Sequence, residues 1–97
     1  MKKNTWEKVV WFFNLQRELG PAFQRVCRQR FIGDKLFKKD SLTLIETYRC
    51  YLTRAGYLKH IGLGLYEITR TIPWTLTSKE CYRRAYPKVT NETTQTV

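Results

Sequence analysis

The first twenty residues carry an apolar pattern typical of an amphipathic helix. The positions that form or widen this stripe are Trp6, Val9, Val10, Phe12, Phe13, Leu15 and Leu19. Asn4 and Glu7 stand three residues apart at its start, which is the spacing of a capping box. We therefore predict a first helix that begins near Thr5 and is ended by Gly20.

A second helix is predicted over about residues 21–30, because Pro21 fits the first turn of a helix, where its missing N–H costs nothing. The side chains expected on its buried face are Phe23, Val26 and, as a further candidate, Cys27. Phe31 is expected to pack just after this helix. Residues 33–39 are polar and basic, so they are predicted to form a loop.

A third helix is predicted over about residues 41–55, with Asp40 or Ser41 as its N-cap. Its apolar stripe consists of Leu42, Ile45, Tyr48, Leu52 and Ala55. Gly56 follows this stripe directly and is expected to end the helix.

The residues after Gly56 have the pattern of a β-hairpin. Two β-rich runs, residues 57–61 and 65–72, flank a short glycine loop at 62–64. In the second run Tyr66, Ile68 and Ile72 alternate with polar residues, so one face is expected to be buried and the other wet. Pro73 is expected to end this strand because proline cannot donate to a ladder.

The end of the chain predicts one more helix and a tail. Thr77 and Glu80 repeat the capping-box spacing, and Pro87 is expected to stop the helix that they open. From Lys88 onward the sequence is rich in threonine and lacks apolar periodicity, which predicts a flexible tail over residues 88–97. The predicted fold class is mainly α with a β-hairpin (α+β), in a single domain over residues 1–87.

Charge narrows the choice of partners. The 97 residues carry eighteen Lys or Arg against eight Asp or Glu, a formal charge of +10. Such a domain attracts polyanions, of which nucleic acid is the commonest, with anionic membranes and acidic protein surfaces as the others. No apolar run approaches the roughly 20 residues that cross a bilayer, and the charged start lacks the features of a secretory signal. We expect a cytoplasmic or nucleoid-associated protein without a membrane partner.

The reactive side chains form no pattern typical of a metal site or a catalytic site. The three cysteines, Cys27, Cys50 and Cys81, are widely spaced, and His60 is the one histidine. A structural zinc site usually draws its four ligands from close pairs, so neither a metal nor another cofactor is expected. The cysteines are expected to be reduced. No nucleophile motif or phosphate-cradling glycine loop is present, so the protein is not expected to be an enzyme.

The segment from residue 41 to residue 72 resembles the recognition helix and wing of the winged helix-turn-helix superfamily. The residues that carry the resemblance are Ile45, Tyr48, Leu52, the run Ala55-Gly56-Tyr57-Leu58, the run Gly62-Leu63-Gly64, and Tyr66. In that superfamily a helix with this stripe ends in an Ala-Gly-Tyr-Leu-like turn and feeds a hairpin with glycines at its tip. The resemblance implies a winged helix: three helices, a β-wing and, here, a short C-terminal helix.

This architecture suggests a surface for duplex DNA, since a B-DNA major groove is about 12 Å wide and admits one helix. The third helix would present its outward face to the groove, while lysines before it and hairpin residues meet the backbone. The candidate nucleic-acid-binding residues are Lys35, Lys38, Lys39, Ser41, Thr43, Glu46, Thr47, Arg49, Cys50, Arg54, Lys59, His60 and Arg70. The expected function is that of a small DNA-binding transcriptional regulator, of a size that suits a bacterial, phage or other mobile-element context.

Several alternatives stay open at this stage. The basic run from Arg25 to Lys39 either binds phosphate or is merely solvated, and Arg49 or Arg54 could pair with Glu46 instead of touching DNA. Glu46 would repel phosphate unless it accepts a hydrogen bond from cytosine. The same fold could serve as a protein–protein or dimerisation module, with Trp74, Leu76 and the aromatic first helix as a partner surface. RNA would be favoured by exposed aromatic side chains, but most aromatics are expected to be buried.

Overall fold

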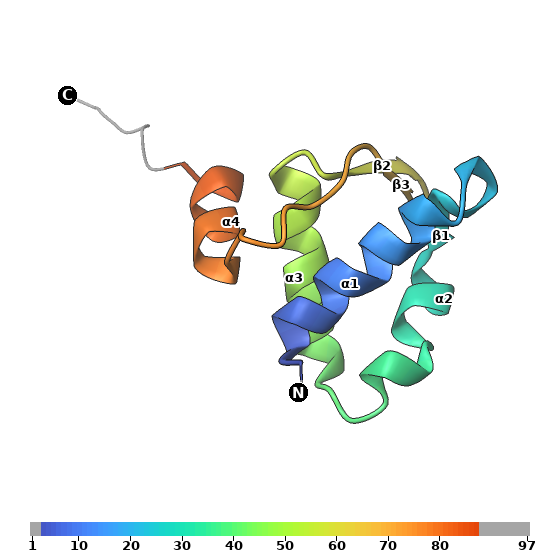
Figure 1. The fold of residues 1–97 in the computed structure, drawn as a ribbon, viewed down its shortest axis with the longest axis horizontal. Coiled ribbons are helices and arrows are strands. Elements are labelled where there is room, and N and C mark those ends of the chain that lie inside the picture. Colours follow the sequence, from blue (N-terminus) through green and yellow to red (C-terminus); the bar gives the residue numbers. More distant parts are fainter. Residues whose placement is uncertain (1–2, 88–97) are drawn as a thin grey trace.

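A computed structural model describes residues 3–87, which form a small α+β domain with a three-stranded antiparallel sheet (Figure 1). The helices of this part are α1 (Thr5–Glu18), α2 (Arg28–Ile32), α3 (Leu42–Arg54) and α4 (Ser78–Ala85). The strands are β1 (Arg25–Cys27), β2 (Leu58–Gly62) and β3 (Leu65–Ile68), and short 3-10 turns occupy Pro21–Phe23 and Lys35–Phe37. The sheet order is β1-β3-β2. The predicted tail, residues 88–97, lies outside the described residues.

The predicted start of α1 is confirmed by its cap. The Asn4 side chain accepts a hydrogen bond from the Glu7 backbone N–H at 2.8 Å, and the Glu7 carboxylate accepts one from the Asn4 N–H at 3.0 Å. The helix ends at Glu18, and Gly20 turns the chain with a φ of 117°. Leu19 lies outside the helix with 52 % of its surface exposed, so its assignment to the buried stripe was wrong.

The prediction of a helix over residues 21–30 is wrong. That segment forms a 3-10 turn, the strand β1 and the first residues of α2, so Val26 is buried as a strand residue while Phe23 and Cys27 are exposed. Pairing with the hairpin explains the difference: Ile68 donates its N–H to the Gln24 carbonyl, and Arg28 donates its own to Gly64. These bonds cover the edge of β3 that β2 leaves open.

The basic loop predicted over residues 33–39 contains a 3-10 turn that was not expected. Asp34 caps this turn by accepting the Leu36 N–H at 2.9 Å, and Phe37 is buried at its end. Leu42, assigned to the buried stripe of the third helix, is 50 % exposed. Phe37 fills core space just before α3, and α3 begins with Leu42 turned to solvent.

The predicted third helix and hairpin are present, with one correction. Ser41 is the N-cap of α3, and Gly56 turns the chain out of it with a φ of 93°. The hairpin's second strand ends at Ile68, so its expected extension to Ile72 and Pro73 was wrong. Beyond Ile68 the chain leaves the sheet, because the backbone of Ile72 bonds to the Asn14 side chain instead of a strand.

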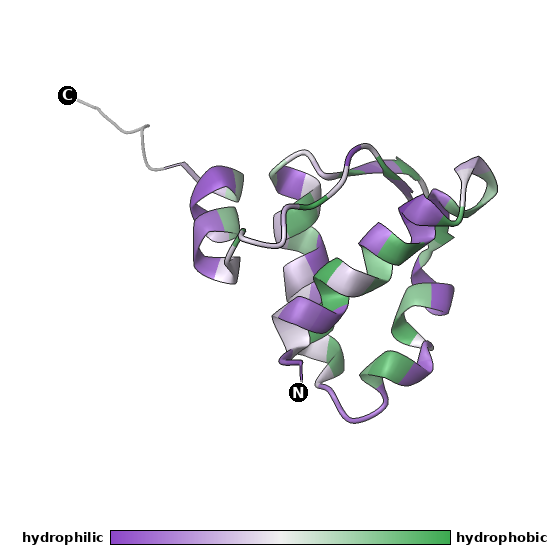
Figure 2. Ribbon diagram, viewed as in Figure 1, coloured by the Kyte–Doolittle hydropathy of each residue, from purple (hydrophilic) through white to green (hydrophobic). Residues whose placement is uncertain are grey.

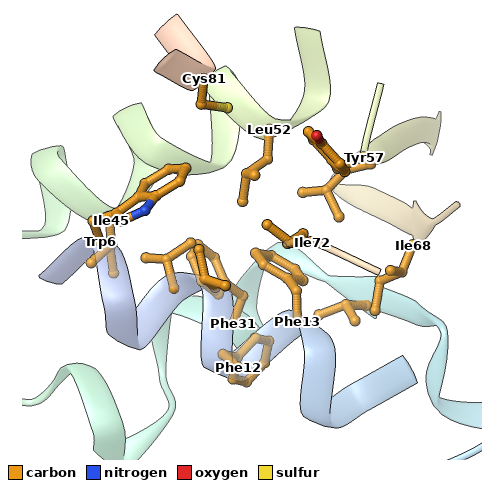
Figure 3. Close-up of a cluster of buried hydrophobic side chains, with 14 of the residues drawn as sticks. Trp6, Phe12, Phe13, Phe31, Ile45, Leu52, Tyr57, Ile68, Ile72 and Cys81 are labelled. Carbon is orange, nitrogen blue, oxygen red and sulfur yellow. The ribbon is translucent and has the colours of Figure 1, made fainter. Parts of the chain in front are cut away.

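The core lies where α1 crosses α3 and the sheet. Figure 3 shows aromatic side chains from α1 and α2 meeting aliphatic side chains from α3 and from the segment after the hairpin. Phe31 of α2 is buried against Phe12 and Phe13, with ring centroids 5.4 and 5.0 Å apart. This aromatic contact joins α2 to α1 and so fixes the chain that leads into α3.

A linking segment, residues 69–77, carries the chain from the hairpin to α4. The Trp6 indole donates a hydrogen bond to the Leu76 carbonyl at 2.9 Å, and Leu76 is buried. The predicted capping box of Thr77 and Glu80 is present, and the helix ends before Pro87 as expected.

Cys81 of α4 is buried in the core, and burial raises the pKa of its thiol to about 11. The thiol is therefore neutral at ordinary pH.

Candidate nucleic-acid interface

The outward face of α3 lies opposite its buried residues Ile45 and Leu52. At 3.6 residues per turn, the positions on that far side form one ridge. This outward ridge consists of Thr43, Thr47, Cys50 and Arg54. All four belong to the predicted site, and the structure brings them together, with the predicted Ser41 as the helix cap that accepts the Leu44 N–H at 3.4 Å.

The two halves of the outward ridge differ in what covers them. At the C-terminal half, the Tyr86 hydroxyl lies 3.9 Å from the Cys50 sulfur, and the Arg54 guanidinium lies 4.9 Å from the centre of the Tyr86 ring. At the N-terminal half, Thr47 donates its hydroxyl to the Thr43 carbonyl at 2.8 Å and keeps its methyl group and oxygen lone pairs for a ligand. The N-terminal half is therefore the part of α3 best suited to contact a groove.

Glu46 does not stand as an isolated negative charge. One of its carboxylate oxygens accepts a hydrogen bond from Arg49 Nε at 3.1 Å, and the other accepts one from Arg28 Nε. The Arg49 guanidinium also lies over the Tyr66 ring at 4.4 Å, and its side chain is only 16 % exposed. The structure thus favours the pairing alternative for Arg49. The three charged side chains together leave a net positive charge on this part of the surface.

The hairpin separates two predicted residues onto opposite faces. Lys59 pairs across the sheet with Glu67, which in turn pairs with Arg25, whereas His60 pairs with Tyr66. Because side chains alternate along a strand, Lys59 lies on the face away from Arg49, and His60 lies on the face toward it. His60 stacks on Tyr66 with ring centroids 4.9 Å apart. Lys59 is therefore opposite an acid and is not gathered with the outward ridge.

Arg70 closes the C-terminal end of α3. It donates a hydrogen bond to the Ala55 carbonyl at 3.3 Å, and its guanidinium lies 4.3 Å from the centre of the Tyr57 ring. A cation at this end of a helix interacts favourably with the last carbonyls. Arg70 is exposed, but these contacts give it a structural role that sequence reasoning could not detect.

The lysine cluster, Lys35, Lys38 and Lys39, stands just before the N-terminus of α3. All three side chains are exposed, and the chain leading into α3 is strongly hydrophilic (Figure 2). The two neighbouring acids are engaged elsewhere, Asp34 with a backbone N–H and Asp40 with α1. The ion pairs within residues 3–87 involve Lys8, Arg28 and Arg49, so the lysine cluster has no carboxylate partner there.

Asp40 fixes this loop to α1. It accepts hydrogen bonds from the Lys8 ammonium at 2.8 Å and from the Thr5 hydroxyl at 2.6 Å. These bonds, chiefly the one from Lys8, lower the pKa of the Asp40 carboxyl below its ordinary value of 3.8. The charged carboxylate therefore stabilises the folded protein above pH 3.8, and this contribution is lost as the pH falls through the lowered pKa.

Replacing Asp40 with asparagine should lower the melting temperature at pH 7, because the ion pair and the charge-assisted bond are lost. The difference from the unmodified protein should shrink as the pH falls from 5 to about 2. Circular-dichroism melting of both proteins across this range measures the difference. A constant difference at every pH would show that the Asp40 charge contributes nothing to stability.

The exposed aromatic side chains do not form a stacking platform. Those exposed within residues 3–87 are Trp11, Phe23, Trp74 and Tyr82. They come from different parts of the fold, and no two of these four rings contact each other in the described part. Successive unpaired bases would need adjacent rings on which to stack. These four exposed rings therefore offer no adjacent pair on which successive unpaired bases could stack.

Two further kinds of feature were sought in the described residues, a helix that could span a membrane and a group of metal ligands. Within the described residues, no helix combines the length and apolar character that crossing a membrane requires. Nor do three His, Cys, Asp or Glu side chains of that part meet in a group that could hold a metal ion. No protein-family model, curated protein or solved structure matches this chain.

Proposed function

We propose that this protein is a winged-helix nucleic-acid-binding protein, and specifically a small DNA-binding transcriptional regulator. The hairpin follows α3 directly, which is the order of elements that the resemblance implies. A glycine is also expected at the tip of the hairpin, and Gly64 there has a φ of 65°. The observation that carries the proposal is the lysine cluster beside the open N-terminal half of α3, where no carboxylate of the described residues neutralises it.

In the proposed complex the N-terminal half of α3 enters the major groove. Helices that read DNA commonly contact base edges with their first residues, and here those are Thr43 and Thr47. The Thr47 methyl group suits contact with thymine, and its oxygen can accept from an amino group. Lys35, Lys38 and Lys39 would bind phosphates, which position the helix without reading sequence. Arg49 and Glu46 would hold the hairpin against α3, and neither would read a base.

Anisotropy titration of a labelled mixed-sequence duplex tests this proposal. Binding should weaken steeply with salt, because each phosphate contact releases condensed counterions. The double variant K38A/K39A should bind more weakly to all sequences, and its slope of log affinity against log salt should be smaller by about one per lost contact. Single-stranded RNA of the same length is titrated in parallel and should bind less tightly than the duplex.

The matched control is K3A/R17A, which removes the same formal charge from α1 and from the residue before its N-cap, since Lys3 precedes Asn4 and Arg17 lies in the last turn of α1. It should change the salt slope much less than K38A/K39A, because α1 packs on the face of α3 opposite the outward ridge. Equal losses for the two double variants would mean that net charge alone drives binding. Absence of duplex binding at low salt would refute the proposal.

One observation favours the alternative of a protein–protein module. Trp74 is 61 % exposed and Leu44 is 37 % exposed, and both line a hollow of about 410 Å³ between α1, α3 and the linking segment. Exposed apolar side chains beside a hollow can receive a partner. Light scattering would reveal a dimer. If the surface around Trp74 forms the interface, Trp74→Ser should dissociate the dimer into monomers. A monomer at all concentrations would leave self-association without support.

A further inference from the structure

The fourth helix lies beside the outward ridge of α3 and contacts it through tyrosines. In Figure 1 α4 runs next to α3, and the rings of Tyr82 and Tyr86 lie 5.2 and 6.1 Å from the ring of Tyr51. Tyr86 also reaches Cys50 on the ridge itself. Packed helix axes are about 8–10 Å apart, so these contacts make α4 an immediate neighbour of α3.

A shallow depression shows which side of α4 shares a surface with the ridge. Its walls come from Leu44, Thr47 and Tyr51 of α3 and from Lys79 and Tyr82 of α4, among others. Thr47 is one of the two candidate base contacts of the proposed function. Lys79 therefore opens onto the same side of the α3–α4 pair as Thr47, and Arg83 follows Lys79 four residues later, one helical turn along α4.

Both of these cations are available for a ligand. Lys79 and Arg83 are exposed, and the ion pairs of the described residues do not include them. Glu80, the one acid in α4, accepts the hydroxyl and the backbone N–H of Thr77, both at 3.4 Å. Most of the α4 ribbon is coloured as hydrophilic in Figure 2. The exposed side of α4 therefore carries positive charge without a carboxylate partner.

We infer that Lys79 and Arg83 form a second phosphate-binding edge, on the side of α3 that carries α4. This inference rests on the proposed function, because it requires α3 in the major groove. A helix with its side chains is about 10–12 Å across and the groove is about 12 Å wide, so only α3 can enter it. Because α4 opens onto the same side as Thr47, a neighbour there with its axis about 8–10 Å away would lie over the adjoining sugar–phosphate backbone. The α4 edge and the lysine cluster would together fix the angle at which α3 enters.

The double variant K79A/R83A tests the α4 edge by duplex titration from 50 to 200 mM salt. The slope of log affinity against log salt should fall by about two, since two phosphate contacts are lost. The affinity advantage of the unmodified protein should accordingly shrink about tenfold over this range of salt. The charge reversal K79E/R83E should weaken binding further. Melting curves should stay close to that of the unmodified protein, because both side chains are exposed.

The control K3A/R17A and the variant K38A/K39A complete the experiment. The inference predicts that K79A/R83A behaves like K38A/K39A and unlike K3A/R17A. If K79A/R83A matches K3A/R17A while K38A/K39A binds weakly, the α4 edge is wrong and the proposed function stands. If the unmodified protein binds no duplex at low salt, the proposed function and the α4 edge both fail.

Discussion

Replacing Phe31 with alanine should lower the free energy of unfolding by about 3–5 kcal/mol, the usual cost of removing a large buried aromatic side chain. Phe31 is 1 % exposed and packs against rings of α1, as well as against Phe37 with ring centroids 5.1 Å apart. It thus joins α2 and the following 3-10 turn to the core. Chemical denaturation followed by circular dichroism gives the change in free energy directly.

The matched control is Phe23→Ala, because Phe23 is 41 % exposed and belongs to no buried cluster of the described residues. Its replacement should change the stability by well under half as much. The loss of Phe31 should also weaken duplex binding, since the lysine cluster lies in the chain that Phe31 and Phe37 attach to the core. A loss of less than 1 kcal/mol for Phe31→Ala would show that this contact is not a main support of the fold.

The elements that were predicted correctly are those whose sequence signals come from residues close together along the chain. Asn4 with Glu7 and Thr77 with Glu80 marked two helix starts, and both capping boxes are formed. Gly56 and Gly64 marked the end of α3 and the tip of the hairpin, and both adopt a positive φ. Each signal depends on residues at most four positions apart, so no knowledge of the tertiary structure was needed.

The strand β1 had no such local signal. It has three residues, of which only Val26 is buried, and this is too short for an alternating pattern to be recognised, while Pro21 suggested a helix instead. The strand exists because β3, about forty residues later, offers an open edge to it. The burial of Phe37 within a basic stretch was missed for a similar reason, since its partners Phe12 and Phe31 come from other elements.

Only part of the geometry of the candidate site follows from spacing along the chain. Thr43 and Thr47 are four residues apart and so lie one helical turn apart on α3, and the lysine cluster directly precedes this helix. The engagement of Glu46 by Arg28 depends on how α2 approaches α3, and the covering of Cys50 and Arg54 depends on Tyr86. Contacts between distant elements decide which cations are available, and the charge pattern alone does not reveal them.

The second large effect is expected at Asn14, a buried polar side chain of α1. Its side-chain N–H₂ donates to the Ile72 carbonyl at 2.9 Å, and its oxygen accepts the Ile72 N–H at 2.8 Å. Asn14→Leu should lower the free energy of unfolding by about 2–6 kcal/mol, because two buried backbone groups lose their partners at about 1–3 kcal/mol each. Chemical denaturation measures this loss, and a change below 1 kcal/mol would contradict it.

Asn14→Asp separates the role of these bonds from that of side-chain shape. A protonated aspartic acid can donate to the Ile72 carbonyl and accept from its N–H, whereas a buried carboxylate cannot donate and is poorly solvated. The pKa of Asp at this position should therefore be raised in the folded state. Relative to the unmodified protein, the variant should be least destabilised below pH 4 and should lose further stability as the pH rises toward 7. If the loss of stability does not depend on pH, the carboxyl is solvated. The Asn14 bonds would then not hold the linking segment, residues 69–77, in its place between the hairpin and α4.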